Sequence, residues 1–314
     1  MFTLIYCFIA NSSAQNQIPI EIKSKARLAF KNDDKKNISL YKVSKPDFSE
    51  KKAYDIIDLL LPNASKQKIE KGNVIHFRKD QKNFKFFKSE GLYIFNDNDI
   101  ESDLTDLPPK QTETINAITG NLLPEAEKML EKLLKKEVDQ FQFMNNEYEY
   151  ITTGPGSENE FLKSVTFRFV RVQDELPICG STNHIKITFD AKGRFSRLVI
   201  KDYKLEKLEM VKRKVKNDRL EKYLRKELKQ PYFAKKPNGE PIAYTNIEVV
   251  DCINAYMPID YKMQKVLLPH AYFKIKSKVA SGETMKSRVF FPFDAEFAAN
   301  VDPEDIIELE EPAK

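Results

Sequence analysis

Hydrophobic positions along the chain follow a recurring order in which an amphipathic helix is succeeded by several strands. Residues 38–43 alternate between apolar and polar side chains, which predicts a strand. Ser49 is a suitable N-cap for a helix that Pro62 ends, and short strands are expected at residues 74–77, 84–87 and 92–95. The apolar face of this helix consists of Ala53, Ile56, Ile57, Leu60 and Leu61.

The same order is predicted twice more. A second helix is expected to begin near Leu123, with Pro124 in its first turn, and to precede strands at residues 140–152, 161–172, 184–189 and 195–200. A third is expected from about Asp218, with strands at residues 245–254, 266–276 and 287–293. Because the strands come in runs, the pattern predicts an α+β fold of tandem units, each a helix packed on an antiparallel sheet.

These patterns divide the chain into four segments. Residues 1–14 form a signal peptide, and residues 15–110 form an N-terminal α+β unit that ends in an acidic, proline-containing linker from Asp97. Residues 111–215 form a second α+β unit. Residues 216–314 form a third, which ends in an acidic tail.

The signal peptide is predicted from an uncharged apolar run that precedes small residues. Ser12 and Ala14 stand at positions minus three and minus one of a cleavage site between Ala14 and Gln15. A signal peptide is one interpretation, in which a start codon farther upstream would account for the lack of Lys or Arg before the run, and a buried N-terminal strand is the other. The first interpretation predicts an exported protein, in a periplasm, on a cell surface or in the medium. No later segment has the length and apolarity of a membrane helix.

Composition argues against nucleic-acid binding. The 52 basic and 47 acidic side chains of the 314 residues leave a net charge of +5, which is too weak for a nucleic-acid-binding surface. The densest basic feature spans residues 212–226. It is either a solvated face, which the interspersed Glu221 and Glu227 favour, or a patch for anionic lipid or an acidic partner.

Two cysteines remain after signal cleavage, Cys179 and Cys252. In an oxidising compartment they could form a disulfide, but one pair in a chain of this length is not a disulfide framework. Two separate buried thiols are the alternative, and the sequence favours it slightly.

The sequence predicts no catalytic residue, cofactor site or metal site. His76, His184 and His270 lie far apart, and Cys179 with His184 forms a catalytic pair only if the fold brings them together. Asp97 and the three acidic residues that alternate after it depart from an EF-hand, because Ser102 occupies the glycine position. The loop at residues 154–157 lacks the spacing and the lysine of a phosphate-binding loop.

Two stretches resemble the propeptide-type modules of secreted thermolysin-like proteases, the PepSY and FTP class. Residues 165–200 contain a strand, a corner and a second strand, and residues 267–296 resemble the closing strands, with His270 as an extra residue. Glu175 stands where glycine is usual in the corner. The positions that match the module in the first stretch are Asp174, Leu176, Pro177, Gly180, Asp190 and Gly193.

This resemblance implies a module that binds, regulates or inhibits another exported protein, such as a protease or a sensor kinase. The matching residues form turns and strands and transfer no active site, and the sequence contains no protease domain after the modules. We therefore expect a non-enzymatic binding protein whose exposed strand edges could pair with a partner. The alternatives are a structural or small-ligand-binding envelope protein and a hydrolase that uses Cys179 and His184.

Overall fold

The computed structural model describes most of the chain. The described residues are 20–24, 26, 37–44, 50–62, 68–152, 159–180, 182–212, 222, 224–225, 228, 244–261, 264–279, 282 and 284–292. The predicted signal peptide with its cleavage site at Ala14 and Gln15, the loop at residues 154–157, the basic residues 213–216 and the acidic tail lie outside them.

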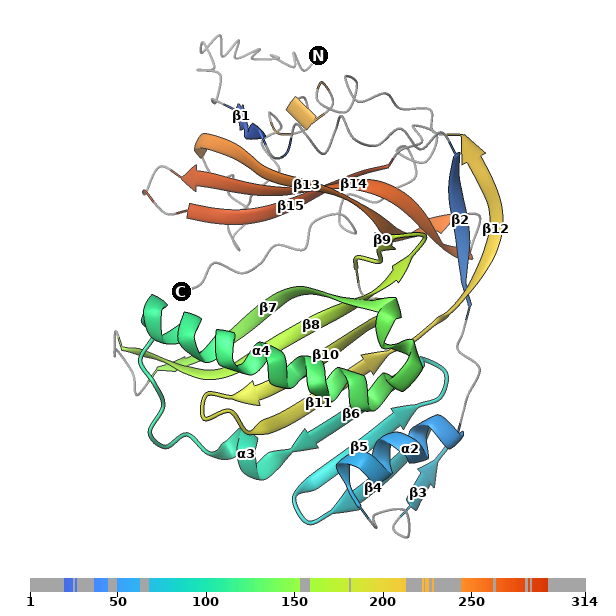
Figure 1. Cartoon of the computed structure of the whole chain (residues 1–314), viewed down its shortest axis with the longest axis vertical. Helices are drawn as coiled ribbons and strands as arrows, with labels where there is room; N and C mark the ends of the chain where they lie inside the picture. The colour runs from blue at the N-terminus through green and yellow to red at the C-terminus, as the bar shows by residue number, and fades with distance from the viewer. Residues whose placement is uncertain are drawn as a thin grey trace, which may run out of the picture.

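Two large, mainly antiparallel sheets stand one above the other (Figure 1). The lower one, sheet B, has the strand order β3-β4-β5-β6-β11-β10-β8-β7, with β9 paired to β8. Its strands are β3 Lys68–Lys71, β4 Val74–Lys79, β5 Lys82–Phe87, β6 Leu92–Asp97, β7 Phe141–Thr152, β8 Glu160–Gln173, β9 Leu176–Pro177, β10 His184–Asp190 and β11 Phe195–Lys201.

The upper one, sheet A, has the order β1-β13-β14-β2-β12, with β15 also paired to β14. One edge of β14 pairs with β13 along its length, and the other edge is shared between β15 and β2. The strands of sheet A are β1 Ile20–Ile22, β2 Asn37–Ser44, β12 Lys204–Lys212, β13 Tyr244–Tyr261, β14 Gln264–Val279 and β15 Thr284–Pro292.

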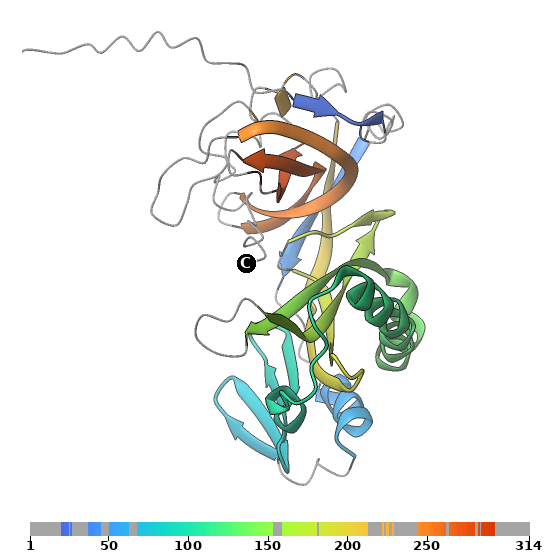
Figure 2. The same ribbon diagram turned by 90° about the vertical axis from the view of Figure 1, so that its left-hand side faces the viewer.

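Two helices cover one face of sheet B. They are α2, Glu50–Leu60, and α4, Thr112–Leu134, which continues into the 3-10 helix η2, Lys135–Gln140. Side chains of α2 such as Ile57 and of α4 such as Ala126 join one hydrophobic core with the strands beneath. The short helix α3, Asn98–Ser102, lies away from α4, on the other side of the sheet (Figure 2). Among the described residues, no helix combines the length and the apolarity needed to cross a membrane.

The predicted fold class is wrong, because the protein is mainly β and does not consist of tandem helix-on-sheet units. β6 pairs with β11, so strands from both sides of residue 110 form one continuous sheet that α2 and α4 share. β2 instead pairs with β12 and β14 in sheet A. Periodicity reports which face of a strand is buried but not which strand lies beside it, and the prediction failed at that point. The segment boundaries themselves stay predictions.

Two local predictions also differ from the structure. α4 begins at Thr112, about three turns before the predicted start, and contains Pro124 in its interior. Thr, Asn and Gly in that stretch have low helix propensity, and burial of Ile115 and Leu122 compensates for it. β3 was not predicted because most of its side chains are exposed, which leaves no apolar alternation.

Candidate functional site

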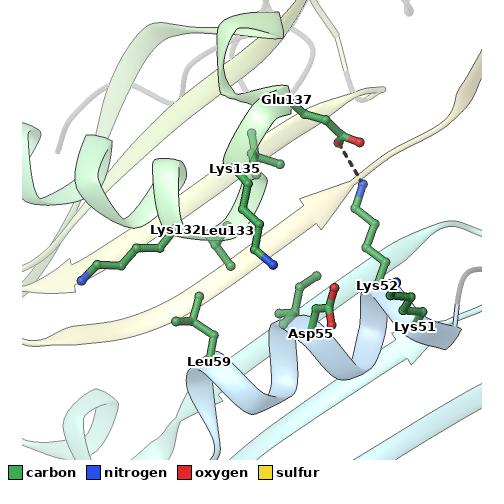
Figure 3. A pocket seen from close by; sticks show the side chains of 10 residues that line it. Lys51, Lys52, Asp55, Leu59, Lys132, Leu133, Lys135 and Glu137 are labelled. Carbon is green, nitrogen blue, oxygen red and sulfur yellow. Dashed lines mark ion pairs between the residues drawn. The ribbon is translucent and has the colours of Figure 1, made fainter.

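A groove lies between α2 and the end of α4, as Figure 3 shows. It encloses about 640 Å³ and lies open to solvent on one side. A volume in this range is typical of ligand-binding clefts. The groove is lined by Lys51, Lys52, Asp55, Ile56, Leu59, Lys132, Leu133, Leu134, Lys135 and Glu137.

The floor of the groove is apolar. Ile56 of α2 and Leu134 of α4 are 3% and 7% exposed, and both belong to the core beneath the helices. Leu59 is 39% exposed, so the apolar surface continues from the core up to solvent. Such a surface between two helices can accept apolar side chains of a ligand.

Lysines form the rim of the groove, and one of them is neutralised within the protein. Lys52 Nζ lies 2.8 Å from Asp202 Oδ2 and 3.5 Å from Glu137 Oε2. Burial lowers the pKa of Lys52, but the carboxylates of Asp202 and Glu137 outweigh this effect and hold the pKa above its ordinary value. Lys52 therefore stays charged, and the carboxylates of Asp202 and Glu137 balance its charge.

The other three lysines of the rim have no such compensation. Within the part of the chain that the structure describes, no ion pair is formed by Lys51, Lys132 or Lys135. Figure 3 shows Lys135 reaching from the end of α4 towards α2, across the groove. These ammonium groups can attract a carboxylate or another anion to a partly desolvated surface.

The backbone of Lys135 has an unusual conformation. The residue is the C-cap of α4, with φ 52° and ψ −113°, and its N–H donates to the carbonyl oxygen of Glu131. A positive φ at a helix end usually selects glycine, because a Cβ is unfavourable there. Residues held in such conformations are concentrated at functional sites, where the strain is offset by the surrounding structure. Lysine at this position, above an apolar groove, is therefore an indication of function.

The three histidines do not meet. His76 lies on β4, His184 on β10 and His270 on β14. Burial lowers the pKa of His184 to about 3 and that of His270 to about 4, although His270 also has a hydrogen bond with the Leu268 carbonyl oxygen. Among the described residues, no group of three or more histidines, cysteines or carboxylates is placed to hold a metal ion.

The two cysteines are free thiols in separate core clusters. Cys179 is 4% exposed and packs with Ala255 and Met257, whereas Cys252 packs with Val249 and Phe273. The buried Nδ1 of His184 has no hydrogen-bond partner in the described part of the chain. A buried thiol is not an accessible nucleophile, and an imidazole with a depressed pKa is not a strong base.

The acidic stretch that begins at Asp97 takes part in structural ion pairs. Asp97 ends β6 and pairs with Lys82 at 3.1 Å. Asp103 pairs with Lys192 at 3.1 Å and Arg194 at 2.6 Å, and hydrogen bonds from Thr105 and Arg194 hold its pKa well below the ordinary value. Helix α3 occupies part of the stretch interpreted as a linker.

The corner that carries the module resemblance joins the two sheets. Asp174 and Glu175 both have positive φ, 48° and 65°, in a two-residue turn between β8 and β9. The Tyr41 hydroxyl donates to Asp174 at 2.7 Å, and the Tyr256 hydroxyl lies 3.3 Å from the same oxygen. The Cys179 N–H then donates to the Tyr256 carbonyl oxygen at 2.8 Å. These residues of the corner therefore form a structural contact between the two sheets.

The lysines of the groove were not identified from the sequence. Lys132 and Lys135 follow the apolar residues of α4 without forming a motif, and α2 precedes them by about 80 positions. The only sequence signal was a lysine at a helix end where glycine is usual. Such a signal is visible only when the end of the helix is known.

Comparisons with known proteins describe the fold but give no function. No family model matches the chain, and no curated protein matches it either. A crystal structure of an uncharacterised protein from Eubacterium rectale ATCC 33656 is similar, with a TM-score of 0.50 and 15% sequence identity. The similarity covers 88% of this chain and 89% of the other. At this identity the similarity concerns the fold alone.

Proposed function

We propose that the protein is an exported, non-enzymatic binding protein that regulates or inhibits another exported protein. In this proposal the groove between α2 and α4 is the binding surface. The observation that carries it is Lys135, which keeps a conformation unfavourable to lysine while its side chain crosses an apolar groove. The signal-peptide pattern supports the exported part of the proposal. The resemblance to the PepSY and FTP modules supports the regulatory part.

The proposed occupant is an acidic segment of the partner that carries leucine-like side chains. The apolar floor of Ile56, Leu59 and Leu134 would receive its apolar residues. Lys51, Lys132 and Lys135 would face its carboxylates, because they have no carboxylate of their own in the described residues. The open side favours a segment of a protein over a fully enclosed small molecule, in the manner of a helix bound in a groove.

An affinity purification with an amine-reactive crosslinker tests the proposal. The tagged chain from Gln15 onward is recovered from the envelope and the culture medium of its source. We expect one reproducible partner whose crosslinks map to the groove lysines. The double variant Lys132→Glu/Lys135→Glu should weaken binding by about tenfold or more, since it places two carboxylates opposite an acidic segment.

The matched control is the double variant Lys71→Glu/Lys85→Glu. It makes the same charge change on exposed positions of β3 and β5, outside the groove. If both double variants lose the partner equally, overall charge is responsible and the groove assignment is wrong. If crosslinks map outside the groove, the partner binds elsewhere.

Lys135→Gly separates function from stability. Glycine tolerates the positive φ, so the variant should raise the free energy of unfolding by about 1 kcal/mol. It also removes the ammonium group, so partner binding should weaken. Lys136→Gly is the control, because it adds the flexibility of glycine to the neighbouring residue and should destabilise the protein. Unchanged binding by a stabilised Lys135→Gly would contradict the role of this lysine.

A further inference from the structure

A second cavity lies on the face of sheet B opposite the core, and it is independent of the groove. It encloses about 260 Å³ between α3 and strands β7, β8, β10 and β11. Its floor consists of hydroxyl groups, of which Thr166 and Thr188 lie 2.8 Å apart and Ser196 is 3% exposed. This volume is smaller than that of sites for drug-sized ligands, which limits the occupant to a small molecule.

Most charged groups around this cavity are compensated within the protein. Glu149 pairs with Lys163 at 2.8 Å and accepts a hydrogen bond from Ser164 at 3.1 Å. Asp103 and Asp190 both pair with Arg194, each at 2.6 Å. These carboxylates need no ligand.

Two charged residues of the lining remain, Glu101 and Arg197, and their charges are opposite. In the described part of the chain, Glu101 and Arg197 form no hydrogen bond and no ion pair, either with each other or with other residues. Glu101 is half-buried, and burial raises its pKa, although Arg197 and Lys163 oppose this effect. A half-buried carboxylate that lacks a hydrogen bond and an ion pair is only partly compensated by cations farther away, so a cationic group bound beside it would be stabilising.

We propose that this pocket binds a free α-amino acid, with the ammonium group at Glu101 and the carboxylate at Arg197. The hydroxyls of Thr166 and Thr188 would supply further hydrogen bonds between the two charged ends. A sugar is disfavoured, because Tyr148, the aromatic residue of the lining, directs its hydroxyl to Thr119 of α4 at 3.2 Å, on the other face of the sheet. No ring therefore forms a stacking surface within the described lining.

Ligand-observed NMR with each common L-amino acid at millimolar concentration tests this proposal on the full chain. The best binder is then compared, by calorimetry, with its N-acetyl derivative and its α-amide. Each derivative lacks one charge, so each should bind about tenfold more weakly or worse. Equal binding of the parent and both derivatives would overturn the proposal, and so would the failure of every amino acid to bind.

Variants place the site and identify each end of the ligand. Glu101→Gln should lower the affinity for the parent amino acid more than for its N-acetyl derivative. Arg197→Gln should lower the affinity for the parent amino acid more than for its α-amide. The controls Glu113→Gln and Arg78→Gln make the same changes at exposed positions outside the pocket and should leave binding unchanged. Loss of binding in the controls as well would show that the ligand occupies another site.

Discussion

The two faces of sheet B show how one set of strands supports two different surfaces. On the face that α2 and α4 cover, Val165, Phe167 and Phe169 of β8 are buried in the core. On the other face, Ser164 and Thr166 of the same strand line a polar pocket. Because side chains alternate along a strand, neighbours in sequence belong to opposite faces.

The cavities on the two faces also differ in their chemistry. The groove beside the helices has an apolar floor and uncompensated lysines, which suits a large acidic and apolar occupant. The polar pocket has a hydroxyl floor and one group of each charge that forms no ion pair among the described residues, which suits a small zwitterion. The difference shows that helices which shield one face can create a groove of their own, while the other face stays polar.

The largest expected effect comes from neighbouring residues on the two faces. Phe167 is 0% exposed and its ring lies 6.2 Å from that of Phe189, so Phe167→Ala should lower the free energy of unfolding by about 3–5 kcal/mol. Thr166→Val removes one hydroxyl of the polar face and should cost about 1 kcal/mol or less. Urea unfolding of both variants measures the difference. Similar losses would mean that the faces do not differ in this way.

Local features of this fold are predictable from the sequence, whereas the pairing of distant strands is not. The strands β4 to β8, β10 and β11 were predicted from alternation, and α2 from helical spacing. The pairing of β6 with β11 was not, because the two strands are separated by about 100 residues and no local signal selects a partner. The groove depends on α2 and α4 lying on one sheet, so the same missing information concealed it.

The pH dependence of stability tests how completely His184 is shielded from solvent on the polar face of sheet B. His184 is on this face, beside Arg168 and Lys186, and burial lowers its pKa to about 3, with those cations and Lys201 adding to the effect. Its ordinary pKa is 6.5, so below that value the unfolded chain binds a proton that the folded protein does not. Stability is therefore complete above the ordinary pKa and is lost as the pH falls towards 3.

We expect this group to reduce the free energy of unfolding by about 2–3 kcal/mol between pH 7 and pH 4.5. His184→Gln should remove that part of the pH dependence, as measured by urea unfolding at both pH values. His76→Gln is the control, because His76 is half-buried and should contribute less. The same pH dependence in His184→Gln and the unsubstituted protein would mean that this histidine is accessible to solvent.

The smallest expected effect concerns the turn between β8 and β9, which contacts sheet A through Asp174. Glu175 has φ 65°, a backbone conformation that favours glycine. Glu175→Gly should relieve the backbone and raise the free energy of unfolding by about 0.5–1 kcal/mol.

Glu175→Ala separates the backbone from the side chain, because it removes the same side-chain contacts while keeping a Cβ at positive φ. Thermal unfolding of both variants should place glycine above alanine, and the difference between them measures the strain of the turn. Equal stability would mean that the turn relaxes to accept any residue. The corner would then be held by the Tyr41 and Tyr256 hydroxyls on Asp174, and the conformation of Glu175 would contribute nothing to joining the sheets.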